Sequence, residues 1–189
     1  MRALTLPLLA FATLLAGCQT PQVGRDADSP YFVPPIGTRF VLEEPITVRG
    51  GQAALYIQAG KVQRYPDLDR YDAHCKFELR TVAEERRKVA PDTFLVRKVE
   101  RYSRSVQHDQ AEPIRVAARG GIRIGAEDDG GPFAEVMTTR LYLHSERQPE
   151  VFRMECSHWD DFHFPEHLTL NQIRKTPCRV CRIELPGGE

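Results

Sequence analysis

Ten residues near the end of the chain, 158–167, concentrate side chains that are able to bind a metal ion. The candidate ligands are three of the six histidines and one aspartate: His158, His163, His167 and Asp160. Imidazole nitrogens and carboxylate oxygens at this density suit a divalent transition metal such as zinc or copper. The spacings belong to no known metal motif, and Pro165 interrupts any helix that would align the rings. We therefore expect a loop with solvated polar groups and no bound metal, and keep metal or small-ligand binding as an alternative.

A second candidate for chemistry is the C-x-x-C pair of Cys178 and Cys181. In thioredoxin-like enzymes such a pair lies within a βαβ unit, follows a strand and opens a helix, which lowers the pKa of the nucleophilic thiol. Here the pair follows a short helical stretch and runs into an extended tail, so the sequence shows no βαβ pattern around it. We predict a structural disulfide between Cys178 and Cys181, with thiol–disulfide activity as the alternative.

The third candidate is a site of lipid modification at the start of the chain. Met1-Arg2 is followed by residues 3–16 without another charge, which is typical of a secretory leader and too short for a spanning helix of about 20 residues. Residues 15–18 read Leu-Ala-Gly-Cys and resemble the lipobox of bacterial lipoproteins. The resemblance implies that residues 1–17 are removed and that Cys18 is acylated. The acyl chains would then hold the protein on a membrane.

The residue after Cys18 bears on which membrane that is. In proteins with a lipobox an aspartate there favours retention at the inner membrane, whereas this chain has Gln19. The resemblance therefore implies the outer membrane, with the protein on its periplasmic face, and makes the inner membrane the less favoured site. Residues 18–35 contain four prolines and polar spacers, so we interpret them as the acylated cysteine and a tether. Residues 36–189 form the predicted periplasmic domain.

With Cys18 assigned to the lipid, four of the five cysteines remain, and an oxidising compartment predicts two disulfides. Four cysteines allow three pairings. Strand alternation places Cys75 on the same face as Phe77, and it places Cys156 on the same face as Met154. Two cysteines that face one core from two strands are suited to a bridge. We therefore predict a disulfide between Cys75 and Cys156, beside the one between Cys178 and Cys181.

The elements that must position these residues are mostly strands. The alternating apolar segments, separated by glycine, proline and aspartate, cover residues 38–42, 46–49, 53–58, 74–82, 93–106, 114–118, 122–124, 134–144, 151–158 and 179–185. About ten short strands at this spacing predict a mainly β fold, a single antiparallel β-sandwich or barrel-like domain. One short helix is predicted near the C-terminus over residues 168–175, with Thr169 as its cap. The charged residues 83–90 are predicted to form a solvated loop.

The tract from Tyr31 onward resembles a type of proteobacterial periplasmic lipoprotein to which no activity is attached. The residues that carry the resemblance are Pro35-Ile36-Gly37-Thr38, Ile57-Gln58-Ala59-Gly60 and the stretch from Asp69 to Leu79. The resemblance supports the localisation and implies no mechanism. Within the last stretch, alternation places His74 on the face opposite the core, where we expect a surface side chain.

Charge and motifs narrow the expected function. The chain has 26 basic and 26 acidic residues, which gives no overall field to hold nucleic acid, and we expect no nucleic-acid partner. It contains no G-x-S-x-G, phosphate-loop, dinucleotide or H-E-x-x-H motif. We therefore expect no catalysis and no cofactor. The expected role is a membrane-anchored interaction or envelope-structure module that binds an envelope protein partner.

Overall fold

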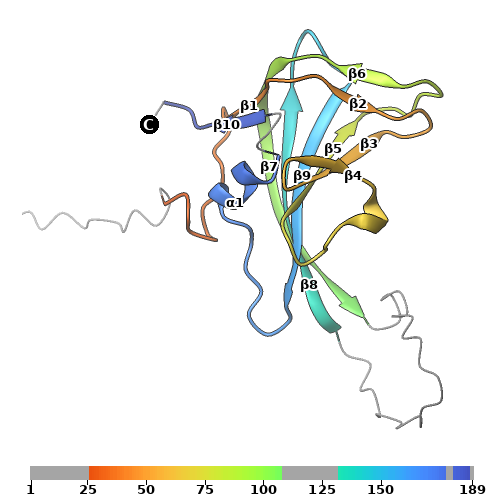
Figure 1. Cartoon of the computed structure of the whole chain (residues 1–189). Coiled ribbons are helices and arrows are strands. Elements are labelled where there is room, and N and C mark those ends of the chain that lie inside the picture. Colours follow the sequence, from red (N-terminus) through yellow and green to blue (C-terminus); the bar gives the residue numbers. More distant parts are fainter. Residues whose placement is uncertain (1–25, 108–131, 178–180, 188–189) are drawn as a thin grey trace, which may run out of the picture.

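The computed structural model describes residues 26–107, 132–177 and 181–187, and this part of the chain forms one curled antiparallel sheet of eight strands (Figure 1). In spatial order the strands are β10 (Cys181–Glu184), β1 (Arg39–Leu42), β7 (Asp92–Gln107), β8 (Pro132–His144), β9 (Val151–Asp161), β5 (His74–Leu79), β3 (Ala54–Gln58) and β4 (Lys61–Gln63). The sheet curls into a half-barrel. The prediction of a mainly β, antiparallel, barrel-like fold is confirmed.

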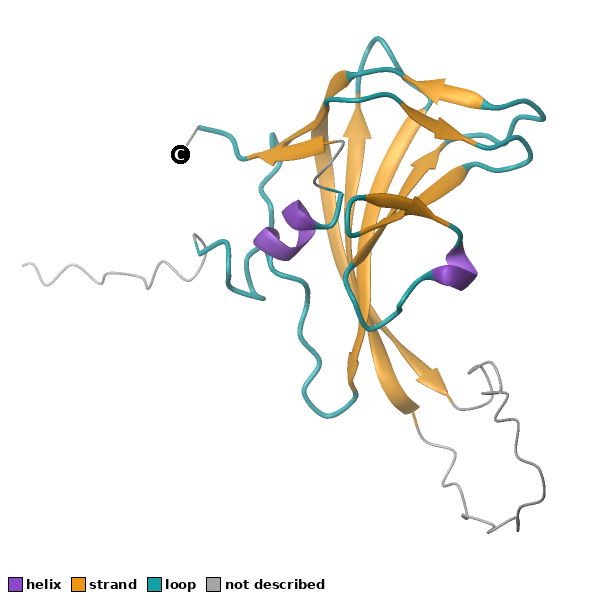
Figure 2. Cartoon of the chain, viewed as in Figure 1, coloured by secondary structure: helices purple, strands orange, loops and turns teal. Residues whose placement is uncertain are grey.

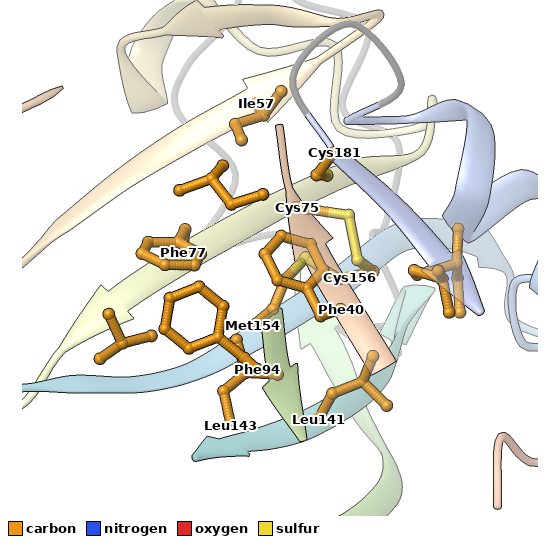
Figure 3. Packing of buried hydrophobic residues seen from close by; sticks show 14 of the residues in the cluster. Phe40, Ile57, Cys75, Phe77, Phe94, Leu141, Leu143, Met154, Cys156 and Cys181 are labelled. Atoms are coloured by element: carbon orange, nitrogen blue, oxygen red, sulfur yellow. A yellow bond between two sulfur atoms is a disulfide. The ribbon is translucent and has the colours of Figure 1, made fainter. Parts of the chain in front are cut away.

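The inner face of the half-barrel holds the hydrophobic core. Alternation places one side chain in two toward it, and the rings of Phe40, Phe77 and Phe94 meet at its centre with centroids 6.0–6.4 Å apart (Figure 3). Leu141 and Met154 extend this core along β8 and β9, and both are almost fully buried. Burying an aliphatic or phenyl side chain of this size contributes about 1.5–3 kcal/mol, so this face provides most of the stabilisation.

Two further elements cover the inner face. A small two-stranded sheet of β2 (Ile46–Val48) and β6 (Arg87–Val89) contributes Ile46, Val48 and Val89 to the same core. Helix α1 (Leu170–Lys175) contributes Leu170 and Ile173 (Figure 2). Thr169 caps the helix, as predicted. Its hydroxyl accepts a hydrogen bond from the backbone amide of Gln172, and the Gln172 side-chain oxygen accepts one from the backbone amide of Thr169, which together form a capping box.

Two short strands were not predicted. Strand β6 lies within residues 83–90, which we predicted to be a loop, and that prediction is wrong for this part: Val89 is buried opposite Ile46, while the other two residues of the strand, Arg87 and Lys88, carry charge. Strand β4 follows a tight turn at Ala59 and Gly60, both with positive φ, and has a single apolar residue. Periodicity over three residues is too short a signal to find either strand. The predicted strands over 114–118 and 122–124 lie outside the described residues.

The described part of the predicted tether packs on the domain. Phe32 is buried in the core, and Asp28 accepts a hydrogen bond from the Asn171 side chain of α1 at 2.8 Å. The guanidinium of Arg101, on the inner face of β7, donates to the backbone carbonyls of Pro30 and Phe32. Residues 26–35 therefore belong to the folded unit, on the same side of the sheet as α1.

A disulfide joins Cys75 and Cys156, as predicted. The two residues are direct partners in the β5–β9 ladder, their Cα atoms are 4.0 Å apart, and both side chains are buried in the core. The bond links positions 81 residues apart and so restricts a large loop of the unfolded chain.

Replacing both cysteines, Cys75→Ala with Cys156→Ala, is expected to lower the free energy of unfolding by about 2–5 kcal/mol, because the loop constraint is lost. Urea unfolding measures the change. The matched comparison is Thr169→Ala, which removes only the cap of α1 and is expected to cost about 1 kcal/mol. A double variant no less stable than Thr169→Ala would contradict a major role for the disulfide.

Candidate functional site

The histidine-rich segment 158–167 is built into the end of the sheet. His158 lies on the inner face of β9, and its Nε2 is 2.8 Å from the carbonyl oxygen of Glu166. Asp160 accepts a hydrogen bond from the amide of Glu166 at 2.8 Å, while His163 is exposed on the connecting loop. Among the residues that the structure describes, no group of three or more histidine, cysteine or acidic side chains is placed to hold a metal ion.

His167, at the end of this segment, lies beside a cation. Burial lowers its pKa, and the charges of Arg101 and His158 lower it further, to about 4. Three polar atoms here are buried without a hydrogen-bond partner in the described part of the chain: Nε of Arg101, Oγ1 of Thr139 and Nδ1 of His167. Arg101 and Thr139 are direct partners in the β7–β8 ladder. The neutral form of His167 is therefore favoured. The side chain lies near Arg101, where residues 26–35 pack against the sheet.

The C-terminal cysteines are placed only in part. Cys181 is buried at the start of β10, and its Sγ lies 3.7 Å from the carbonyl oxygen of Pro177. Cys178 lies outside the described residues, as does Cys18, so both the predicted Cys178–Cys181 bond and the lipidation at Cys18 stay predictions.

The candidate binding site is a hollow of about 320 Å³ on the outer face of the sheet, which we call the outer hollow. The registers place its lining in adjacent rows across β5, β9, β8 and β7. One row runs His74, Ser157, Thr138 and Tyr102, and the next runs Trp159, Val136 and Arg104. The floor is deep because its central side chains, Ser157, Thr138 and Val136, are small while those at the rim are large.

A wall closes one side of the outer hollow. It consists of the 3-10 turn η1 (Tyr65–Asp67) and the loop that follows, beyond β4 in Figure 2. The side chain of Gln58 donates to the carbonyl of Asp69 at 2.7 Å and accepts from its amide at 3.0 Å. The amide of Trp159 donates to the carbonyl of Arg70 at 2.7 Å. These bonds hold the wall against the sheet and so define the shape of the hollow.

Aromatic rings line the rim of the outer hollow. They are Tyr56 and Tyr65 on one side, Trp159 near the wall and Tyr102 on β7. The Arg70 guanidinium lies over the rings of Tyr65 and Trp159, at 5.4 and 5.0 Å from their centroids. Tyr102 is fixed by Arg140, which donates to its hydroxyl at 2.7 Å.

His74 lies on the floor and is nearly buried, so the expectation of a surface side chain is wrong. It does point away from the core, as alternation predicts, but the wall covers it. Its Nδ1 is 3.1 Å from the carbonyl oxygen of Asp72, which can only accept, so Nδ1 carries the proton. Burial lowers the pKa of His74, and the neutral ring leaves Nε2 as an acceptor.

The charges around the outer hollow do not balance. Among the described residues that line it, the one carboxylate is Glu155, which is held by Arg140 and Arg153, at 2.5 and 3.0 Å. Lys76 pairs with Glu78. Within the described residues Arg70 and Arg104 have no carboxylate partner, so the hollow keeps a local positive charge although the chain as a whole is neutral.

A second hollow of about 420 Å³, the edge hollow, lies beside the first. Its lining comes from the end of β2 and the residues after it, from β3, and from β4 with η1: Thr47, Arg49, Gln52, Ala53, Ala54, Leu55, Tyr56, Val62, Gln63, Arg64, Tyr65 and Pro66. Tyr56 and Tyr65 line both hollows, and their rings are in contact, with centroids 5.2 Å apart. The two hollows therefore meet at this pair of tyrosines.

Comparison with known protein families, with curated proteins and with solved structures finds no match to this chain. In the described ranges, no helix has the length and apolar character needed to cross a membrane.

Sequence reasoning missed the outer hollow. Its rings are scattered over four segments of the chain, and alternation alone places them on the polar face without showing that they converge. The order of the strands and the fold of the wall bring them together. Neighbouring basic residues also diverge, since Arg101 turns to the inner face while Arg104 faces the outer hollow.

The environment of His167 generates a pH prediction. Because its pKa is about 4 in the folded protein and about 6.5 in the unfolded chain, the unfolded state binds more protons as pH falls. The free energy of unfolding is expected to decrease as the pH is lowered from about 6.5 to 4. Urea unfolding at several pH values measures this, and His167→Gln should flatten the decrease.

The control for this experiment is His144→Gln, an exposed histidine at the end of β8, which should leave the decrease unchanged. Acidic groups act in a lower range. Although burial raises the pKa of Asp92, hydrogen bonds from Ser145, Arg147 and Gln148 hold it at about 2. An equal decrease in wild type and His167→Gln would show that His167 is not responsible.

Proposed function

We propose that this chain is a lipid-anchored, non-catalytic binding protein of the bacterial envelope. It is attached through Cys18 to the periplasmic face of the outer membrane and holds its ligand in the outer hollow. The anchor rests on the leader and on the Leu-Ala-Gly-Cys sequence at residues 15–18, with Gln19 favouring the outer membrane. The binding role rests on the structure of the domain.

The observation that carries the binding role is the preformed outer hollow. Large rings surround a floor of small polar side chains, and the wall is held by side-chain and backbone hydrogen bonds. Concave sites that combine apolar rings with a few converging polar groups are the usual form of ligand sites in proteins. Exposed rings such as Tyr65, 45% accessible, leave contact area for a ligand.

The polar groups of the floor support binding rather than catalysis. Ser157 shares a hydrogen bond of 3.0 Å with Thr138, and the described structure shows no bond between its hydroxyl and the adjacent His74. A serine nucleophile needs a base within hydrogen-bond reach of its hydroxyl. The carboxylate of Glu155 is engaged by the guanidinium groups of Arg140 and Arg153, so it is not free to act on a ligand.

The anchor predicts the location of the protein in cells. Replacing Cys18, Cys18→Ala, removes the site of acylation and is expected to move the protein from the membrane fraction to the soluble periplasmic fraction. Fractionation followed by immunoblotting measures the distribution. Cys75→Ala, a cysteine of the core, is the matched control and should leave membrane attachment intact. Membrane attachment of the Cys18→Ala variant would contradict the anchor.

The binding role predicts where envelope ligands contact the domain. A photo-crosslinking phenylalanine analogue at Tyr65 is expected to capture a component of the envelope in living cells. The same analogue at Phe164, which is 85% accessible and outside both hollows, is the control. Capture at both positions or at neither would contradict binding in the hollow.

A further inference from the structure

The arrangement of the two hollows indicates the shape of the ligand. The outer hollow and the edge hollow adjoin each other and share the Tyr56–Tyr65 pair. A compact small molecule would fill one of them, whereas a linear molecule can fill both. Building on the proposed binding function, we propose that the ligand is an acidic glycan strand that crosses this pair of tyrosines and occupies both hollows.

The rings suit the flat faces of sugars. A pyranose presents an apolar C–H face that packs on an aromatic ring, while its hydroxyls point sideways toward polar groups. Tyr56 and Tyr65 lie at the junction of the hollows, and Trp159 and Tyr102 stand on opposite sides of the floor. Strands β7 and β9 are about 10 Å apart because β8 alone separates them, which leaves room for one sugar ring between these side chains.

The floor suits a ligand rich in hydroxyl groups. The neutral ring of His74 offers Nε2 as an acceptor, and the hydroxyls of Thr138 and Ser157 can both donate and accept. Thr138 and His74 are 3% and 7% exposed, so a bond formed here is shielded from water. A simple anion would use only donors. A sugar hydroxyl uses both kinds of group.

The arginines add the requirement for negative charge. The Arg70 guanidinium lies over the rings of Tyr65 and Trp159 and has no carboxylate partner in the described structure, so its N–H groups can donate to a carboxylate or a phosphate of the ligand. Arg104 stands at the other end of the floor, and Arg49 lines the edge hollow. The described structure gives none of the three a carboxylate partner, whereas Lys76, Lys98, Arg140 and Arg153 of the outer face all form ion pairs.

The position of the floor disfavours a peptide ligand. Extended peptides are commonly bound by adding a strand to the open edge of a sheet, where backbone groups are unpaired. Here the floor is formed by β5, β9 and β8, and each of these strands is paired on both sides. The floor therefore offers side chains alone, which is the usual means by which proteins hold a carbohydrate.

The test measures binding of soluble probes to the purified full chain in detergent by isothermal titration calorimetry. The acidic probes are peptidoglycan glycan fragments, which carry carboxylates, and the core oligosaccharide of lipopolysaccharide, which carries phosphates. Neutral maltohexaose and poly-glutamate are the comparison probes. At least one acidic glycan is expected to bind about tenfold or more tightly than both, and the tighter of the two acidic glycans identifies the source.

Variants link this binding to the site. Arg104→Gln, which removes a side chain without a described partner, is expected to weaken acidic-glycan binding by about tenfold, and Tyr65→Ala to weaken it by at least as much. The matched control is Arg97→Gln, an exposed arginine on the same strand and outside both hollows, which should bind like wild type.

Three outcomes would overturn the proposal. Equal affinity for maltohexaose would remove the need for charge, and tighter binding of poly-glutamate would replace the glycan by an acidic peptide. Failure of every probe to bind would remove the glycan as well. In each case crosslinking at Tyr65 in cells tests the proposed function separately, because capture there requires a ligand of any class, whereas its absence contradicts binding in the hollow itself.

Discussion

The register between β5 and β9 is the constraint on which the two faces of the molecule depend. The bond between Cys75 and Cys156 fixes this register near one end of the ladder. If β5 slipped by one residue against β9, Phe77 would turn outward and Lys76 would enter the core, because successive side chains of a strand alternate between faces. The disulfide thus does more than restrict the unfolded chain: it maintains the separation of an apolar inner face from a polar outer face.

The outer face of the sheet has two parts, a region of paired charges and the outer hollow. Lys76, Glu78, Arg153, Glu155, Arg140, Glu100 and Lys98 form a continuous series of ion pairs across four strands. Such pairs contribute little each to stability, but they leave few charges free to attract a partner. Beside these ion pairs lies the outer hollow, where Arg70 and Arg104 have no carboxylate partner among the described residues. Recognition can therefore be local on a protein whose net charge is zero.

Local patterns predicted the elements that local forces determine. Alternation gave the long strands and the Cys75–Cys156 pair, and Thr169 marked the start of α1. Alternation did not predict β6, because its three residues form a strand only through the pairing of Val89 with Ile46. The side chains of 158–167 are dense in the sequence but do not converge in the described structure, because neighbouring residues of a strand point to opposite faces: His158 faces inward and Trp159 outward. The outer hollow depends on strands distant in sequence and on a loop that no periodicity describes.

The docking of residues 26–35 bears on how an anchored molecule would sit. Because Phe32 packs in the core, only residues 19–25 would separate a lipid on Cys18 from the folded domain. A segment of that length spans about 24 Å when it is fully extended. That is less than the thickness of the bilayer's hydrocarbon, about 30 Å. The first described residues, 26–28, lie on the side of the sheet that bears α1, whereas the outer hollow opens on the opposite face of the sheet. A lipid anchor at this distance would hold the domain close to the lipid headgroups, with the outer hollow facing the cell interior.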